Sequence, residues 1–273
     1  STSRRQRQMC IRDRSIIMEH EFFFPPYIGE LYGNTESAFS GIRVMALGNS
    51  HYCDKRHPSL PSQRHNYPQN SNIRCGKKCI HYLENGVCPN ATINDEMEST
   101  GWTVDGARSH IAWCYEKDYN CAHPYNNRAL SKFSKIFGAK NKLEIAKVVK
   151  SIAHYNLLQA AVPTNSSQGV DSELEPSKRL VIKAIQKLRP DIVLIWGYEN
   201  VLRHMLDEFN HTSENITWTP FETNNQCGYI NGHCIKLLCT YHPSNLHDPN
   251  NLKAKETIAH YAPELFSKLN LKV

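Results

Sequence analysis

Short apolar runs alternate with segments of helical periodicity along much of the chain. The runs at residues 41–48 (GIRVMALG) and 191–197 (DIVLIWG) are nearly continuous, which is typical of parallel strands buried on both faces, and residues 234–240 (CIKLLCT) resemble them. The segment 152–159 (IAHYNLLQ) is compatible with a strand or a loop. The pattern therefore predicts several buried strands separated by other elements.

Apolar residues recur at helical spacing between these runs. We expect helices within 142–151, within 180–188 before Pro190, and within 201–209. The first of these places Leu143, Ala146, Val148 and Val149 near one another on one helical surface. A last helix should begin at Asp248-Pro249, an N-cap followed by a first-turn proline. Its predicted buried stripe consists of Ile258, Tyr261, Leu265 and Leu269.

Two segments lack periodicity. Residues 162–175 are predicted to form a loop, and residues 55–125 are rich in Asn, Pro, His and Cys, which indicates a long insertion or a small cysteine-containing lobe. Alternating strands and helices predict an α/β fold with a mainly parallel central sheet, a three-layer α/β/α sandwich. We expect one such domain over residues 18–273, with the insertion at about 55–125.

The composition is that of an ordinary globular protein, with 40% hydrophobic and 21% charged residues, so disordered, collagen-like and coiled-coil classes are excluded. The net charge of +6 would suggest an anionic partner. However, residues 1–17 hold five arginines and one aspartate, so the remainder carries only +2. Their RRQRQMCIRDR core resembles translated sequencing-adapter read-through. We expect a foreign or disordered segment with Met18 as the natural start; a genuine basic arm is the alternative.

Ten cysteines are present, one of them in the first 17 residues. An odd remainder and the lack of a secretory apolar stretch favour free thiols in a reducing, cytoplasmic compartment over a disulfide framework. The longest clean apolar run is far shorter than a bilayer-spanning helix requires. We therefore expect a protein with no membrane partner.

Polar residues follow the predicted strands, where an α/β sheet binds its ligands. The motifs LGNSHYC, HYNLLQAAVP, KLRPDIVLIWG and YHPSN occur in that order from about Tyr27 onward. Together they resemble the uracil-DNA glycosylase superfamily, and most closely a branch whose first motif reads Gly-Glu-Ser-His-Tyr. The resemblance implies a monomeric base-excision enzyme that hydrolyses the N-glycosidic bond of uracil or another damaged base in single- or double-stranded DNA, without a required cofactor.

The resemblance also implies roles for individual residues. His242 matches the histidine that donates a hydrogen bond to the oxyanion developing on the base. Asn156 matches the asparagine that reads the base edge. Gly48 would allow close backbone approach, and His51 and Tyr52 would line the substrate site. For His242 and Asn156, a purely structural role is the alternative.

The first motif departs from the superfamily pattern. Asn49, which with Ser50 would position the attacking water, stands where related sequences carry Glu. An amide can hold a water molecule but cannot accept its proton, so general-base assistance would be missing. The alternative function is therefore a catalytically impaired nucleic-acid or nucleotide-binding module of the same fold.

Two further sets of residues are candidates for binding. Ser244 and Asn245 could contact DNA phosphates, and Leu246 could act as a wedge; a simple turn before the last helix is the alternative. Cys75, Cys79 and Cys88, with His51, His57, His65 and His81 nearby, could bind zinc or an iron–sulfur cluster, although free thiols fit the spacing as well.

Overall fold

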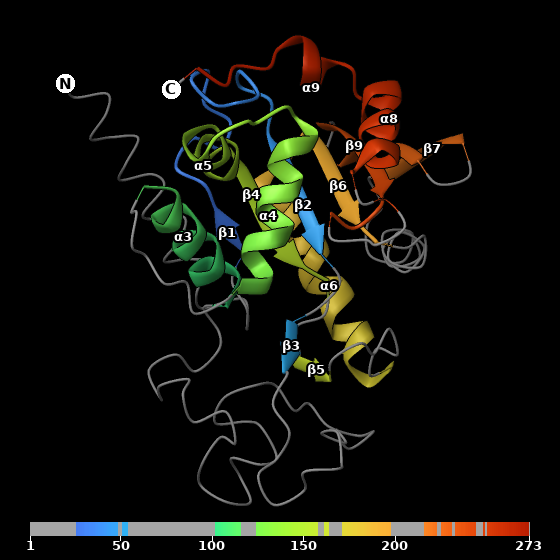
Figure 1. Ribbon diagram of the computed structural model, residues 1–273. Helices are drawn as coiled ribbons and strands as arrows, with labels where there is room; N and C mark the ends of the chain where they lie inside the picture. Colours follow the sequence, from blue (N-terminus) through green and yellow to red (C-terminus); the bar gives the residue numbers. More distant parts are fainter. Residues whose placement is uncertain are drawn as a thin grey trace, which may run out of the picture.

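The computed structural model describes residues 26–48, 51–53, 102–115, 124–157, 161–163, 171–197, 216–222, 225–230, 233–243, 248 and 250–272. Its centre is a seven-stranded sheet in the order β1-β4-β2-β6-β9-β8-β7 (Figure 1). Its strands are β1 (Tyr27–Ile28), β2 (Val44–Gly48), β4 (Ile152–Asn156), β6 (Ile192–Trp196), β7 (Ile216–Glu222), β8 (Asn225–Ile230) and β9 (His233–Thr240). The α/β class predicted from the alternation is confirmed.

The sheet is mixed. Strands β4, β2, β6 and β9 pair in parallel, whereas β1, β8 and β7 pair antiparallel at the two sides. The apolar runs predicted β2, β6 and β9, and the segment left open as strand or loop forms β4. A second, two-stranded parallel sheet joins β3 (His51–Cys53) to β5 (Ala161–Pro163) with His51 opposite Ala161. Because β3 follows β2 and β5 follows β4, the two segments that pair in the main sheet pair again beyond it (Figure 1).

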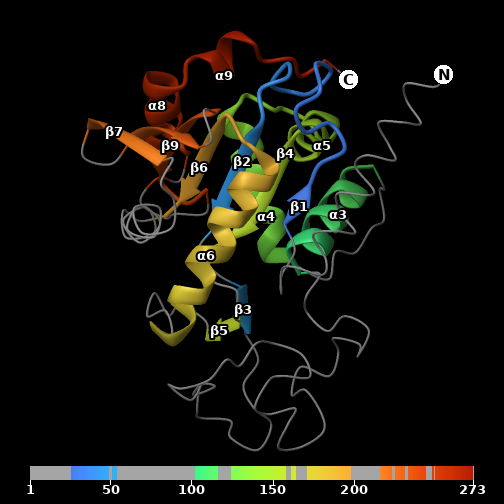
Figure 2. The same ribbon diagram turned by 180° about the vertical axis from the view of Figure 1, so that it is seen from behind.

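The helices are α3 (Trp102–Tyr115), α4 (Pro124–Ile136), α5 (Lys142–Lys150), α6 (Asp171–Leu188), α8 (Leu252–Tyr261) and α9 (Glu264–Ser267). In Figure 1 α4 crosses in front of the sheet, and α6 crosses in front of it in the reverse view of Figure 2. Among the described residues, none of these helices has the length and apolar character that crossing a bilayer demands.

Two hydrophobic clusters follow from the alternation of side chains along the strands. Val44 and Ala46 belong to a cluster with α3, α4, α5 and α8, whereas Met45 and Leu47 belong to one with α6. Every residue of β2 is buried, which explains why this strand reads as a continuous apolar run.

Side-chain hydrogen bonds hold both ends of helix α5, which directly precedes β4. Asn141 caps it: its Oδ1 accepts from the Glu144 amide at 3.0 Å, and its Nδ2 donates to Glu144 Oε1 at 2.8 Å. At the other end, Ser151 Oγ donates to the Lys147 carbonyl at 2.6 Å and accepts from the Ala38 amide at 2.8 Å. The side chain of Ser151 therefore anchors the turn that leads into β4.

Several sequence-based expectations are wrong in detail. Residues 102–115, inside the predicted irregular segment, form α3, and Ala107 and Cys114 join the core. Residues 162–163 and 171–175, predicted as loop, belong to β5 and α6. Leu143 is 43% exposed, and Ile145 on the same helix is buried instead. Local periodicity missed these because tertiary contacts, which no single segment encodes, decide them.

The predicted last helix is divided in two. α8 begins at Leu252 rather than at Pro249, and the Asp248 carboxylate caps it from a distance by accepting from the Lys253 amide at 3.2 Å and the Ala254 amide at 3.1 Å. α8 ends at Tyr261, and Pro263, which lacks an amide hydrogen, precedes α9. The expected segment 201–209 lies outside the described residues.

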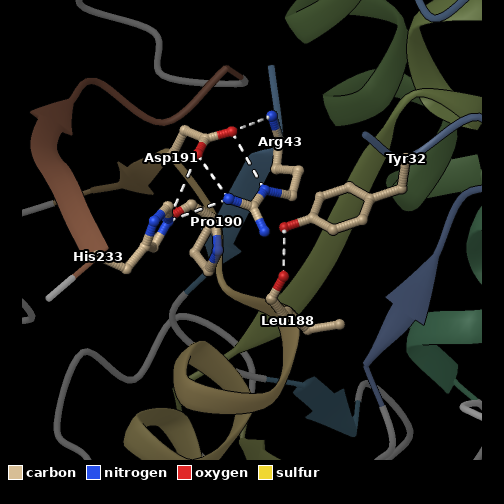
Figure 3. Close-up of polar contacts among 6 residues, drawn as sticks. All are labelled: Tyr32, Arg43, Leu188, Pro190, Asp191 and His233. Carbon is tan, nitrogen blue, oxygen red and sulfur yellow. Dashed lines mark hydrogen bonds and ion pairs between the residues drawn. The ribbon is translucent and has the colours of Figure 1, made fainter. Parts of the chain in front are cut away.

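The amino ends of the parallel strands are joined by a polar group comprising Arg43, Asp191 and His233, here called the amino-edge cluster (Figure 3). Arg43 donates to the Asp191 carboxylate from Nη2 at 2.8 Å, from Nε at 3.2 Å and from its backbone amide at 2.7 Å. His233 Nε2 lies 2.9 Å from the Pro190 carbonyl, which can only accept. These contacts connect the starts of β2, β6 and β9.

Candidate active site

The carboxyl ends of the parallel strands meet along one edge, opposite the amino-edge cluster. Gly48, the last residue of β2, pairs with Asn156 at the end of β4, and the Leu157 amide donates to the Gly48 carbonyl at 2.9 Å. Trp196 at the end of β6 pairs with Thr240 at the end of β9. His242 follows two residues later. Parallel pairing therefore brings together positions almost 200 residues apart in sequence.

Small residues on β2 allow side chains of its two neighbours, β4 and β6, to contact each other across it. β4 and β6 flank β2 and lie roughly 10 Å apart, since adjacent strands are spaced by about 4.8 Å. His154 and Trp196 nevertheless pack ring against ring, with centroids 5.0 Å apart at 36°. At the level of these two rings β2 presents Ala46 and Gly48 on this face, so nothing larger than a methyl group separates the rings.

Gly48 is required by space rather than by its backbone angles. A Cβ at this position would overlap Asn156 Oδ1 and would lie 3.7 Å from His154 Nε2. The Asn156 amide therefore packs directly against the backbone of β2, and it is only 8% exposed. The group that approaches the Gly48 backbone in this structure is Asn156, and the role of Gly48 in substrate binding stays a prediction.

His242 contacts the same indole from a different direction. Its ring packs edge-on against Trp196 at 5.8 Å and 82°, while Phe133 of α4 contacts Trp196 at 5.1 Å. Trp196 is 3% exposed and is held by all three rings. We refer to Gly48, His154, Asn156, Trp196 and His242 as the edge cluster.

Both histidines of the edge cluster are uncharged at neutral pH. Burial, together with the neighbouring His242, lowers the pKa of His154 to about 4. Burial also lowers the pKa of His242, with an added contribution from the positive charge of Lys132. A neutral imidazole carries one N–H donor and one acceptor nitrogen, so the two rings can bind polar groups without introducing charge.

Two buried nitrogen atoms at the site make no hydrogen bond within the described part of the chain. They are His154 Nε2 and Trp196 Nε1. Leaving such an atom unpaired typically costs about 1–3 kcal/mol. An all-apolar arrangement of these rings would avoid that cost, so the histidine at 154 is not explained by packing alone.

The sequence-predicted residues fall into two groups. The structure brings Gly48, Asn156 and His242 to one edge, as the motif order required. His51 and Tyr52 form β3, paired with β5, and only their backbone is described. The others lie outside the described residues: Asn49, Ser50, Ser244, Asn245, Leu246, Cys75, Cys79 and Cys88.

Sequence reasoning missed His154 and Trp196. His154 lies two residues before Asn156, and β-strand alternation places both on one face, so the period of two was an available signal. Trp196 was seen only as part of an apolar run. The gap above β2 that joins them depends on strand order, which the local pattern does not encode.

The edge cluster contains amide and imidazole groups around an indole and no carboxylate. In the described part of the chain, no three His, Cys, Asp or Glu side chains gather in a way that could hold a metal ion. The arrangement is suited to hydrogen bonding with a flat polar ring. No family model and no curated protein matches this chain.

Proposed function

We propose that the chain is a DNA base-excision glycosylase that hydrolyses the N-glycosidic bond of uracil or another damaged base. The observation that carries the proposal is the edge cluster, in which the strand ends bearing three of the four superfamily-like motifs contribute Gly48, Asn156 and His242 around Trp196. The proposed architecture is a three-layer α/β/α sandwich over residues 18–273, with an insertion at about 55–125 that includes α3.

His242 is proposed as the donor that stabilises the departing base. When the bond between the base and C1′ breaks, its electron pair leaves with the base, and negative charge develops on a base oxygen. Because the pKa of His242 is lowered by burial, its imidazole is neutral and donates one hydrogen bond without transferring a proton. The Trp196 ring fixes its orientation before the substrate arrives.

Asn156 is proposed to read the edge of the base. Its amide offers a donor and an acceptor side by side, the pattern that complements a paired base edge. Its packing against Gly48 restricts the rotation of the side chain. The choice between bases therefore depends on the absence of a side chain at position 48.

Water completes the reaction by adding its oxygen to C1′, and the proton that it loses passes through solvent to the anionic departing base. Asn49 and Ser50, which directly follow β2, are the residues proposed to hold it. Neither is a carboxylate, so we expect slow turnover. The impaired binding module remains the alternative function for this reason.

The test is release of free base from oligonucleotides that carry uracil or another modified base. We expect release by the unmodified chain and a reduction of about 10²–10³-fold in His242→Ala. The matched control is His260→Ala, since His260 is exposed on α8 and lies outside the edge cluster. Undiminished release by His242→Ala would refute its role, and DNA binding without any release would favour the binding module.

A further inference from the structure

We propose that Tyr241 and Lys253, here called the rim pair, bind a nucleotide of single-stranded DNA next to the base held at His242. This inference rests on the proposed function and adds the form of DNA that the site accepts. It concerns exposed residues outside the edge cluster.

The chain passes from the surface to the edge cluster within one residue. Thr240, the last residue of β9, is buried, Tyr241 is 38% exposed, and the next residue, His242, packs its ring against Trp196. Tyr241 is therefore exposed to solvent, whereas the next side chain, that of His242, belongs to the edge cluster. A nucleotide stacked on Tyr241 would be adjacent along the strand to a base at His242.

Positive charge lies on both sides of this position. Lys253 Nζ is 5.3 Å from the centre of the Tyr241 ring, and Lys132 of α4 is close enough to lower the pKa of His242. Asn251 Nδ2 donates to the Lys132 carbonyl at 3.4 Å, which connects the start of α8 to α4. Among the described residues, Lys253 and Lys132 are the cations that the contacts place beside Tyr241 and His242, and they are the groups proposed for phosphate.

The N-terminus of α8 does not supply the phosphate site. The Asp248 carboxylate already accepts from the Lys253 and Ala254 amides, and its side chain is buried. A phosphate must therefore be held by the ammonium group of Lys253. The exposed Leu252, 57% accessible beside it on the same helix, adds apolar surface for a sugar or base.

The exposed ring favours a single strand. In a duplex both faces of a base are covered by its neighbours, whereas an unpaired base can stack on an aromatic side chain whatever its sequence. Phosphate contacts alone would not discriminate, because both forms carry them. We therefore assign the preference for single strands to Tyr241.

The chain contains a matched control at the other edge of the sheet. Tyr115 is 50% exposed, and Lys150 Nζ lies 4.7 Å from its ring centre, a Tyr–Lys arrangement like that of the rim pair, except that Lys150 also forms an ion pair with Glu30 at 2.9 Å. Lys150 ends α5 just before β4 begins, so it lies at the amino edge. If DNA binding depends on the position next to the edge cluster, substitution of Tyr115 should leave it unchanged.

The experiment measures dissociation constants by fluorescence anisotropy for a uracil-containing single strand and for its duplex. We expect Tyr241→Ala to weaken single-strand binding by about 5- to 150-fold, the range for losing one stacked base, and to change duplex binding little. Tyr241→Phe and Tyr115→Ala should both resemble the unmodified chain. Lys253→Gln should reduce the slope of log K against log salt concentration by about 0.7.

Three results would overturn the inference: unchanged single-strand affinity in Tyr241→Ala, equal weakening of duplex binding, or the same loss in Tyr115→Ala. Tighter binding of the corresponding RNA would overturn the assignment to DNA. Base release by the unmodified chain with no effect of Tyr241→Ala on binding would leave the proposed function standing without this inference. Tyr241-dependent binding without base release would support this inference and contradict the proposed glycosylase activity.

Discussion

Replacing His154 by phenylalanine should make the protein more resistant to acid. The substitution keeps an aromatic ring against Trp196 and removes both the titrating group and the buried Nε2 atom that has no hydrogen bond. At pH 7 the folded protein contains a neutral His154, so the substitution should change the free energy of unfolding by only about 1 kcal/mol in either direction.

The magnitude follows from the lowered pKa. Below the ordinary value of 6.5 the unfolded chain gains a proton at His154, whereas the folded chain does so only near pH 4. The stability is fully present above pH 6.5 and is lost as the pH falls toward 4. Each unit corresponds to about 1.4 kcal/mol, so the loss is about 2 kcal/mol at pH 5 and up to about 3 kcal/mol at pH 4.

Urea unfolding followed by circular dichroism at pH 7, 6, 5 and 4.5 measures this effect. The free-energy curves of the unmodified chain and of His154→Phe should diverge below pH 6.5, with the variant losing less stability. Other titrating groups act alike in both proteins and cancel in the difference. His260→Phe, at an exposed histidine, should follow the unmodified chain. Parallel curves for the unmodified chain and His154→Phe would refute the burial argument.

Three other changes test separate parts of the structure. Gly48→Ala should displace Asn156 and destabilise the fold by about 1–3 kcal/mol, and adding Asn156→Ala should remove most of that cost; additive effects in the double variant would contradict the proposed overlap. Asn49→Glu should raise the rate of base release by about 10²-fold or more by restoring a proton acceptor, and an unchanged rate would show that the missing carboxylate does not limit turnover. Asp191→Ala should lower stability by about 1–3 kcal/mol in thermal or urea unfolding but leave base release nearly unchanged at saturating substrate, because Asp191 and its partner Arg43 lie at the amino edge.

Much of the central sheet could be predicted from the chain. The runs that became β2 and β6 are continuous because both faces are covered, and burial on two faces leaves a signal that needs no tertiary information. The run that became β9 was recognised as well, although β9 is only partly buried. Strands β7 and β8 were not predicted, since antiparallel strands at the side of a sheet depend on pairing partners. Helix α3 was missed because its contribution to the core, including Ala107 and Cys114, appears only once it packs on the other helices.

The candidate site likewise contains residues that could be predicted from the sequence and residues that could not. Gly48, Asn156 and His242 could be named in advance because each ends or follows a recognisable strand, and the rule that ligands bind beyond the carboxyl ends of parallel strands needs only the local pattern. The capping carboxylate of Asp248 was also recognised, although the helix that it caps begins later than expected. These are properties of short segments.

By itself, the sequence determined the α/β class, most of the buried strands and three candidate residues at or after the strand ends, because local periodicity and turn chemistry act over a few residues. Only the tertiary structure decided that β2 lies between β4 and β6, so that Ala46 and Gly48 leave room for His154 to meet Trp196. Burial at that meeting point, not the residue types themselves, keeps both histidines neutral. Strand order and desolvation depend on the whole chain, and no local pattern encodes them.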